Sequence, residues 1–147
     1  MTDREEGEKI MLGIIIMGHG HFGSGMNSAL QLIAGQMEHV AYLDFTEDKD
    51  MEQLLEELRK KIASMKVEKY AVLCDINGGT PYKTAVLFGI ERDNVDIFSG
   101  INLPFLLELC LSRMNNEDYE IFIDTIMVNT AQSLQRLDKD RLKELAN

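Results

Sequence analysis

The stretch that decides the fold is "GIIIMGHGHFGSG", residues 13–25. Its first half is continuous, apolar and rich in isoleucine, which is typical of a strand buried on both faces of a parallel sheet. Three glycines follow with the spacing GxGxxG, at Gly18, Gly20 and Gly23. Two histidines, His19 and His21, stand between them. The stretch therefore allows two interpretations, a loop that binds dinucleotide phosphates or a loop that presents a histidine.

The rest of the chain alternates short apolar runs with segments of helical periodicity. The apolar runs predict strands at residues 12–17, 40–45, 70–75 and 95–98. Helical spacing predicts helices at residues 24–36, at 51–65 after a capping box of Asp50 and Gln53, from Pro81 after an N-cap at Thr80, at 103–114 and at 118–137 with Leu134 on its apolar side. This alternation predicts an α/β fold, a doubly wound and mostly parallel sheet with helices on both faces.

Length, charge and cysteine content limit the class of protein. The 147 residues suffice for one domain, and we expect residues 1–10 to be a flexible leader and residues 11–147 a single domain. The net charge of −10 argues against a nucleic acid or an anionic membrane as partner. Cys74 and Cys110 lie in apolar segments without metal-type spacing, as free thiols of a reducing compartment do. No apolar run approaches the roughly 20 residues that cross a bilayer, so we expect a cytoplasmic protein.

Polar residues and glycines follow three of the predicted strands. They are Gly18, His19, Gly20 and His21, then Asp75, Gly78, Gly79 and Thr80, then Ser99, Gly100 and Asn102. Ligands of open parallel sheets bind outside the carboxyl ends of the strands. We therefore expect these three groups to meet at one edge of the sheet.

A nucleophilic histidine would use this edge fully. An imidazole attacks well near neutral pH when a partner holds its second nitrogen, and Asp75 could be that partner for His19. Backbone N–H groups of Gly78, Gly79 and Thr80, at the start of a helix, form a natural site for an anion, and the Thr80 hydroxyl could add a bond. The alternative is a capped helix, a loop histidine and a tight turn that coincide without a common function.

Two other site chemistries fit less of the sequence. In a dinucleotide site, Asp44, 21 residues after Gly23, could hold a ribose, but "CDINGGTP" would then have no role. In a metal site, His19, His21 and Asp75 could supply three ligands, but HxH within a glycine loop is weak evidence. We expect neither a metal nor a cofactor, and we expect His21 to line the site or contact a partner.

Several quoted stretches occur together in one known family. With "IIIMGHGHFGSGM", "CDINGGTPY" and "SGINLPFLLE" in this order, the chain resembles the mannose-type IIA component (EIIA, mannose/fructose/sorbose family) of the bacterial phosphoenolpyruvate-dependent sugar phosphotransferase system. The resemblance covers about residues 11–137. It implies a doubly wound α/β fold and a homodimer. It also implies that His19 is phosphorylated on its outer ring nitrogen, that Asp75 orients it and that Thr80 contacts the phosphoryl group.

The resemblance also implies the partners. The phosphocarrier HPr would donate the phosphoryl group and the IIB component would accept it, with the membrane components IIC and IID involved only indirectly. Asn102 would line the site or contact a partner, and no cofactor is needed. Two related roles stay open, a phosphotransfer subunit serving dihydroxyacetone kinase and a regulatory phosphoacceptor domain. The family's dimers can exchange a C-terminal strand, whereas the pattern from Leu134 onward favours a helix that extends the last one or lies along a neighbouring subunit.

Overall fold

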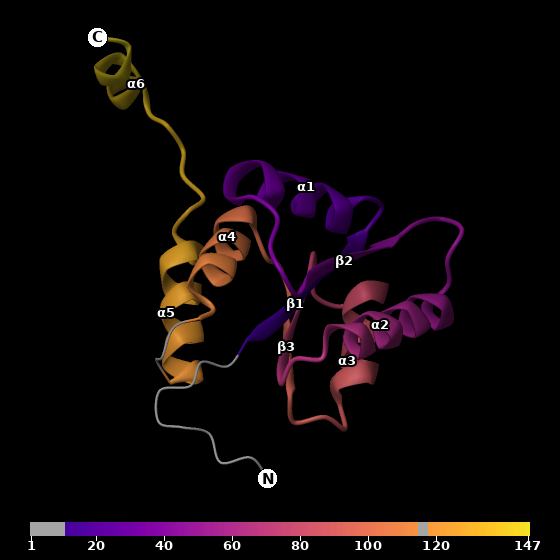
Figure 1. Cartoon of the computed structure of the whole chain (residues 1–147). Coiled ribbons are helices and arrows are strands. Elements are labelled where there is room, and N and C mark those ends of the chain that lie inside the picture. The colour runs from indigo at the N-terminus through magenta and orange to yellow at the C-terminus, as the bar shows by residue number, and fades with distance from the viewer. Residues whose placement is uncertain (1–10, 115–117) are drawn as a thin grey trace.

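A parallel sheet lies at the centre of the molecule (Figure 1). The computed structural model describes residues 11–114 and 118–147, and in these residues four strands form one sheet in the order β2-β1-β3-β4. The strands are β1 (Leu12–His19), β2 (Val40–Phe45), β3 (Lys69–Cys74) and β4 (Val95–Phe98). The helices are α1 (Phe22–Ala34), α2 (Met51–Met65), α3 (Thr80–Gly89), α4 (Leu103–Ser112), α5 (Tyr119–Ala131) and α6 (Lys139–Ala146). The expected leader, residues 1–10, lies outside the described residues.

Strand β1 divides the core into two layers. Ile14 and Ile16 point to a cluster that contains residues of α1, α4 and α5, while Ile15 and Met17 point to a second cluster with α2 and α3. All four side chains are completely buried. Figure 1 shows these two groups of helices on opposite faces of the sheet. The predicted doubly wound α/β architecture is therefore confirmed, with every strand pair parallel.

A capping box marks the start of α2, and close packing against the sheet marks the start of α1. At α2, Asp50 accepts a hydrogen bond from the Gln53 backbone and Gln53 returns one to the Asp50 backbone, so the predicted capping box is confirmed. Helix α1 begins at Phe22, two residues earlier than predicted. It packs very close to the sheet there, because a side chain on Gly23 would come within 2.8 Å of the backbone oxygens of Ile16 and Leu43.

The predicted helix over residues 118–137 is wrong at its end. Helix α5 stops at Ala131, and α6 begins only at Lys139 after its own N-cap, Asp138. The prediction placed Leu134 on the apolar side of this helix, but the side chain lies beyond the end of α5 and is 93% exposed. Figure 1 shows α6 standing away from the sheet and the other helices at the end of an extended connection.

A buried cation joins the end of α4 to the amino end of the sheet. The guanidinium of Arg113 donates to the backbone oxygens of Leu12 at 3.1 Å and His39 at 3.4 Å, and also to that of Glu38. Arg113 is only 8% exposed. Since His39 also accepts from the Ile14 backbone, this one side chain ties together the starts of β1 and β2.

We predict that Arg113→Met lowers the free energy of unfolding by about 3 kcal/mol, because one buried and two partly buried carbonyl bonds lose their charged donor. Urea denaturation followed by circular dichroism measures this change. Arg59→Met is the matched control, since Arg59 lies on α2 with its side chain 55% exposed and pairs there with the equally exposed Glu56. Equal stabilities of the two variants would contradict the structural role of Arg113.

Candidate active site

A histidine–aspartate pair lies at the carboxyl edge of the sheet. His19 ends β1 and Asp75 directly follows β3, its neighbour in the sheet. Nδ1 of His19 lies 2.8 Å from Oδ2 of Asp75, and the backbone N–H of His19 donates to the same oxygen at 2.9 Å. Oδ1 of Asp75 accepts from the backbone of Ile76 at 2.8 Å. With a carboxylate at Nδ1, the neutral ring carries its proton there and leaves the Nε2 lone pair free.

The surroundings keep Asp75 ionised. Burial raises the pKa of the carboxyl group, but hydrogen bonds from the backbone and ring of His19 and from the backbone of Ile76 outweigh it and hold the pKa below 3.8. The side chain of Asp75 is 13% exposed, whereas that of His19 is 45% exposed. The pair therefore presents an oriented imidazole to solvent, with a negative charge behind it that would stabilise a positive ring.

The glycine loop before α3 lies directly against this imidazole. A Cβ on Gly79 would come within 2.6 Å of Cε1 and 3.2 Å of Nε2 of His19, so only a glycine leaves room for the ring. Gly78 has φ +83°, the left-handed region that favours glycine. The two glycines thus let the loop approach the histidine closely.

The start of α3 lies beside the free nitrogen. Gly79 is the N-cap and Thr80 the first helical residue, one position earlier than predicted, and no side chain caps the helix. The first-turn N–H groups of any helix have no intrahelical partner, and here the N-cap has no side chain to accept from them. Pro81, in this first turn, has no N–H to donate. The partial positive charge of a helix N-terminus favours an anion here, next to Nε2 of His19.

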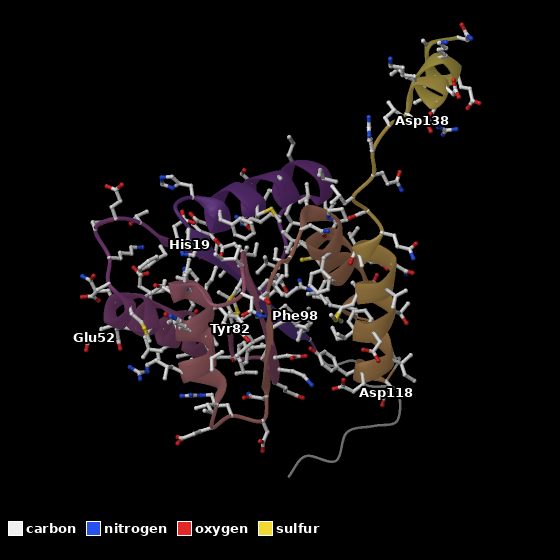
Figure 2. The ribbon with its side chains drawn as sticks, turned by 180° about the vertical axis from the view of Figure 1, so that it is seen from behind. His19, Glu52, Tyr82, Phe98, Asp118 and Asp138 are labelled. Carbon is white, nitrogen blue, oxygen red and sulfur yellow. The ribbon has the colours of Figure 1, made fainter. Side chains whose placement is uncertain are left out.

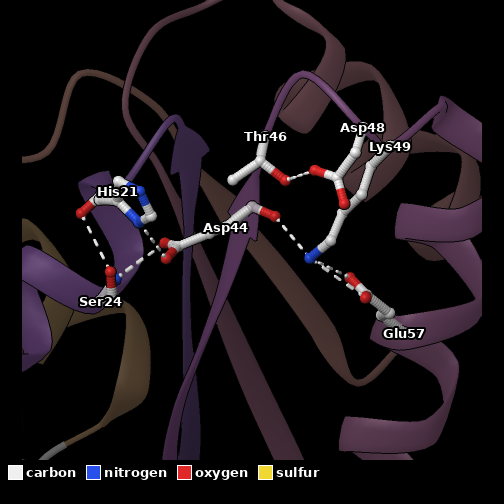
Figure 3. Close-up of polar contacts among 7 residues, drawn as sticks. All are labelled: His21, Ser24, Asp44, Thr46, Asp48, Lys49 and Glu57. Atoms are coloured by element: carbon white, nitrogen blue, oxygen red, sulfur yellow. Dashed lines mark hydrogen bonds and ion pairs between the residues drawn. The ribbon is translucent and has the colours of Figure 1, made fainter.

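The second histidine belongs to a different pair. Nδ1 of His21 lies 3.3 Å from Oδ2 of Asp44, and Oδ1 of Asp44 accepts from the backbone of Ser24 at 2.9 Å (Figure 3). The acid that a dinucleotide site would use for a ribose therefore holds the start of α1. Packing likewise accounts for Gly18, because a Cβ there would lie 2.4 Å from the Phe22 ring. The glycine pattern thus serves to bring α1 onto the sheet.

The remaining predicted residue, Asn102, caps α4. Its side-chain oxygen accepts from the backbone of Phe105 at 2.9 Å, and its amide donates to Ser133 at 3.1 Å. Asn102 lines a hollow of about 160 Å³ between the end of β4 and α5. Its capping role was not predicted, although Asn followed by Leu-Pro at the start of a helix is a sequence signal for it. A role for Asn102 in the site stays a prediction.

Two apolar neighbours of the pair were missed. The ring of Phe45 meets that of His19 edge-on, with centroids 6.0 Å apart, and Ile76 is an isoleucine 54% exposed immediately after Asp75. The pairing of β1 with β2 could have indicated Phe45, since this residue ends β2 directly opposite His19. Within residues 11–114 and 118–147, no three His, Cys, Asp or Glu side chains gather as a metal site would require.

Comparison with known proteins assigns the chain to a family. A family model described as "PTS system fructose IIA component" (PTS, phosphotransferase system) matches residues 13–127. The fructose-specific EIIA component of Bacillus subtilis (strain 168) is 29% identical over 126 residues, which are 85% of this chain and 86% of that protein. The mannose-specific EIIAB component of Escherichia coli (strain K12) is 24% identical over 110 residues, and the match covers 74% of this chain but only 34% of that longer protein.

A solved structure agrees with the sequence relatives. The phosphotransferase system component EIIA from Streptococcus agalactiae superposes with a TM-score of 0.78 at 29% sequence identity, and the match covers 86% of this chain and 97% of that one. No helix of the described part combines the length and apolar content needed to cross a membrane.

We predict that Gly79→Ala displaces the His19 ring, because the added methyl group would overlap it, and so weakens the hydrogen bond to Asp75. The imidazole resonances of His19 in two-bond ¹H–¹⁵N correlation spectra measure this change. Gly25→Ala is the control, since nothing lies within 4 Å of a Cβ at that position of α1. Unchanged His19 resonances in a folded Gly79→Ala protein would contradict this account of the glycine loop.

Proposed function

The chain belongs to the family of PTS IIA components of the mannose and fructose type, and on that premise we propose that it carries a phosphoryl group on His19. The group would come from HPr and pass to a IIB component during sugar uptake. The His19–Asp75 pair supports this proposal most directly, because it leaves Nε2 unprotonated at the exposed edge of the sheet. Residues 11–147 would together form one phosphocarrier domain.

The transfer is a displacement at phosphorus between two histidines. The lone pair on Nε2 of His19 attacks the phosphorus carried by the donor, a phosphohistidine of HPr, and the bond from phosphorus to the donor ring breaks. The proton on Nδ1 stays between His19 and Asp75, whose negative charge offsets the positive charge on the phosphorylated ring. Transfer to IIB reverses the roles, with His19 as the leaving group. The phosphoryl group arrives already activated, so the step needs no further co-reactant.

The start of α3 would bind the phosphoryl oxygens. Free N–H groups around Gly79 and Thr80 and the Thr80 hydroxyl lie at the helix end that favours an anion. These donors are fixed by the backbone, so they need little reorganisation as charge moves between the two rings. Gly78 contributes through the turn that brings them close to His19.

Docking of both partner proteins would use the same edge of the sheet. HPr and IIB must each bring a reactive group to Nε2 of His19, so their binding surfaces on this chain would overlap. Ile76 offers an exposed apolar contact beside the pair, and we assign His21 and Asn102 to the border of the surface. The net charge of −10 would favour donors with a basic face. The relatives are named for fructose, mannose and sorbose, and we propose that membrane components make the choice among such sugars.

We predict one acid-labile phosphoryl group on the chain after incubation with phosphoenolpyruvate, enzyme I and HPr. Intact-mass spectrometry measures it on the native chain and on His19→Ala and His21→Ala. The group should be present on the native chain and His21→Ala and absent from His19→Ala. The His19 ring is oriented by Asp75 and lies against the start of α3, whereas the first turn of α1 beside His21 already donates to Asp44.

Three outcomes would contradict the proposal. Loss of the group in His21→Ala alone would move the nucleophile to the other histidine. No phosphorylation of the folded native chain would refute the carrier function and favour a regulatory role. Transfer onward to a kinase subunit in place of IIB would favour the dihydroxyacetone-type relatives.

We further propose that two copies of the chain associate through the C-terminal arm, residues 132–147. Every residue of the arm is exposed, and its leucines have no core beneath them. The exposed fractions are 93% for Leu134, 53% for Leu137, 54% for Leu142 and 63% for Leu145. Helix α5 adds the exposed side chains of Ile121 and Val128. A second copy of the chain would remove this apolar surface from water.

We predict a dimer for the native chain and a monomer for the double variant Leu142→Lys/Leu145→Lys, because the variant places two charges on the apolar side of α6. Light scattering after size-exclusion chromatography measures the mass. Glu144→Lys changes the net charge of α6 by the same amount and should remain dimeric. A monomeric native chain, or a dimeric double variant, would refute the role of the arm.

A further inference from the structure

We propose that Asp44 is a positioning residue for phosphoryl transfer: it orients the ring of His21 at the exposed face of the loop that carries His19. This inference rests on the proposed function. His21 and Asp44 form a second histidine–aspartate pair, two residues along the loop from the first. In both pairs the acid binds Nδ1 and leaves Nε2 without a contact to that acid. The Asp44 side chain contacts both the His21 ring and the backbone of Ser24 at the start of α1.

The end of β2 holds the histidine loop on both sides. Phe45 accepts a hydrogen bond from the backbone of Gly20 at 2.9 Å, and Gly20 adopts φ +57°, which favours glycine. Oδ1 of Asp44 accepts from the backbone of Ser24, in the first turn of α1, at 2.9 Å. His21 lies between these two anchors. The loop backbone is therefore fixed immediately before and shortly after His21.

The second oxygen of Asp44 is left to orient the His21 ring. Nδ1 of His21 lies 3.3 Å from Oδ2, and the ring is 82% exposed while the Asp44 side chain is only 13% exposed. His21 is the N-cap of α1 but makes no side-chain cap bond, so its ring is not used by the helix. An exposed imidazole oriented by a largely buried acid is suited to contact a group of a docked partner.

Contacts from α2 and its preceding loop fix Asp44 from the other side (Figure 3). The ammonium group of Lys49 donates to the backbone oxygen of Asp44 at 3.0 Å and pairs with Glu57 at 3.2 Å. Burial raises the pKa of Asp44, but hydrogen bonds from Ser24 and the contact with His21 outweigh it and keep the pKa below 3.8. The residue is thus an ionised and anchored acceptor. The neighbouring Asp48 instead bonds Thr46 within the loop.

The test compares Asp44→Asn with the control Asp48→Asn in the complete chain. The asparagine oxygen can still accept from Ser24, but its amide donates to Nδ1 of His21 and so moves the ring proton to Nε2. We expect kcat for transfer from phosphorylated HPr to fall roughly tenfold or more, with the control unchanged. Two-bond ¹H–¹⁵N correlation spectra should show the His21 proton moved to Nε2 and the His19 ring unchanged.

A double-variant cycle then shows whether Asp44 acts through His21. His21→Gln should slow the transfer by itself, and the variant carrying both changes should be no slower than the slower single variant. Independent, multiplied effects would overturn the proposal, as would an Asp44→Asn rate equal to that of the control. If Asp44→Asn fails to fold, His21→Gln decides alone, because it keeps the Ser24 contact, and a native rate would overturn the proposal. A native chain that accepts no phosphoryl group would instead refute the proposed function.

Discussion

The burial of β1 on both faces is the constraint on which the rest of the structure depends. Four consecutive side chains, from Ile14 to Met17, are completely removed from water and point alternately to the two layers of helices. A strand of this kind is stable only between neighbouring strands and beneath helices on both faces. The same pairing fixes the site, because β1 carries His19 to the edge where β2 ends in Phe45 and β3 is followed by Asp75.

Glycines, which leave space where other residues have a side chain, are as important to the site as the groups that react. Gly18 and Gly23 leave the space that Phe22 and the strand backbones fill, so α1 can start directly after the histidine loop. Gly79 leaves the space for the His19 ring against the start of α3. A glycine pattern that resembles a phosphate-binding fingerprint is thus explained by close packing between elements. The helix start that lies against the His19 ring without a side-chain cap is that of α3, where we propose that the phosphoryl group binds.

The sequence sufficed for features that depend on local patterns and on the rules of parallel sheets. Continuous apolar runs located all four strands, and their carboxyl ends indicated that His19 and Asp75 would meet. The end of α5 could not be predicted, because Leu134 continues the helical spacing, whereas its 93% exposure away from the core depends on the tertiary structure. The partner of Asp44 was also missed, since an acid at a strand end looks the same whether it binds a ligand or the backbone of Ser24.

The two histidine–aspartate pairs differ in ways that support the different roles we propose for them. The His19 pair is the shorter, at 2.8 Å against 3.3 Å, and its ring is the less exposed, at 45% against 82%. The His19 ring lies against the start of α3, which has no side-chain cap, whereas the first turn of α1 beside His21 already donates to Asp44. In the proposed transfer, the first-turn N–H groups of α3 would be available to a phosphoryl group on His19, whereas the N–H of Ser24 beside His21 already donates to Asp44. This difference in available donors supports His19 as the proposed acceptor and leaves His21 to contact a partner.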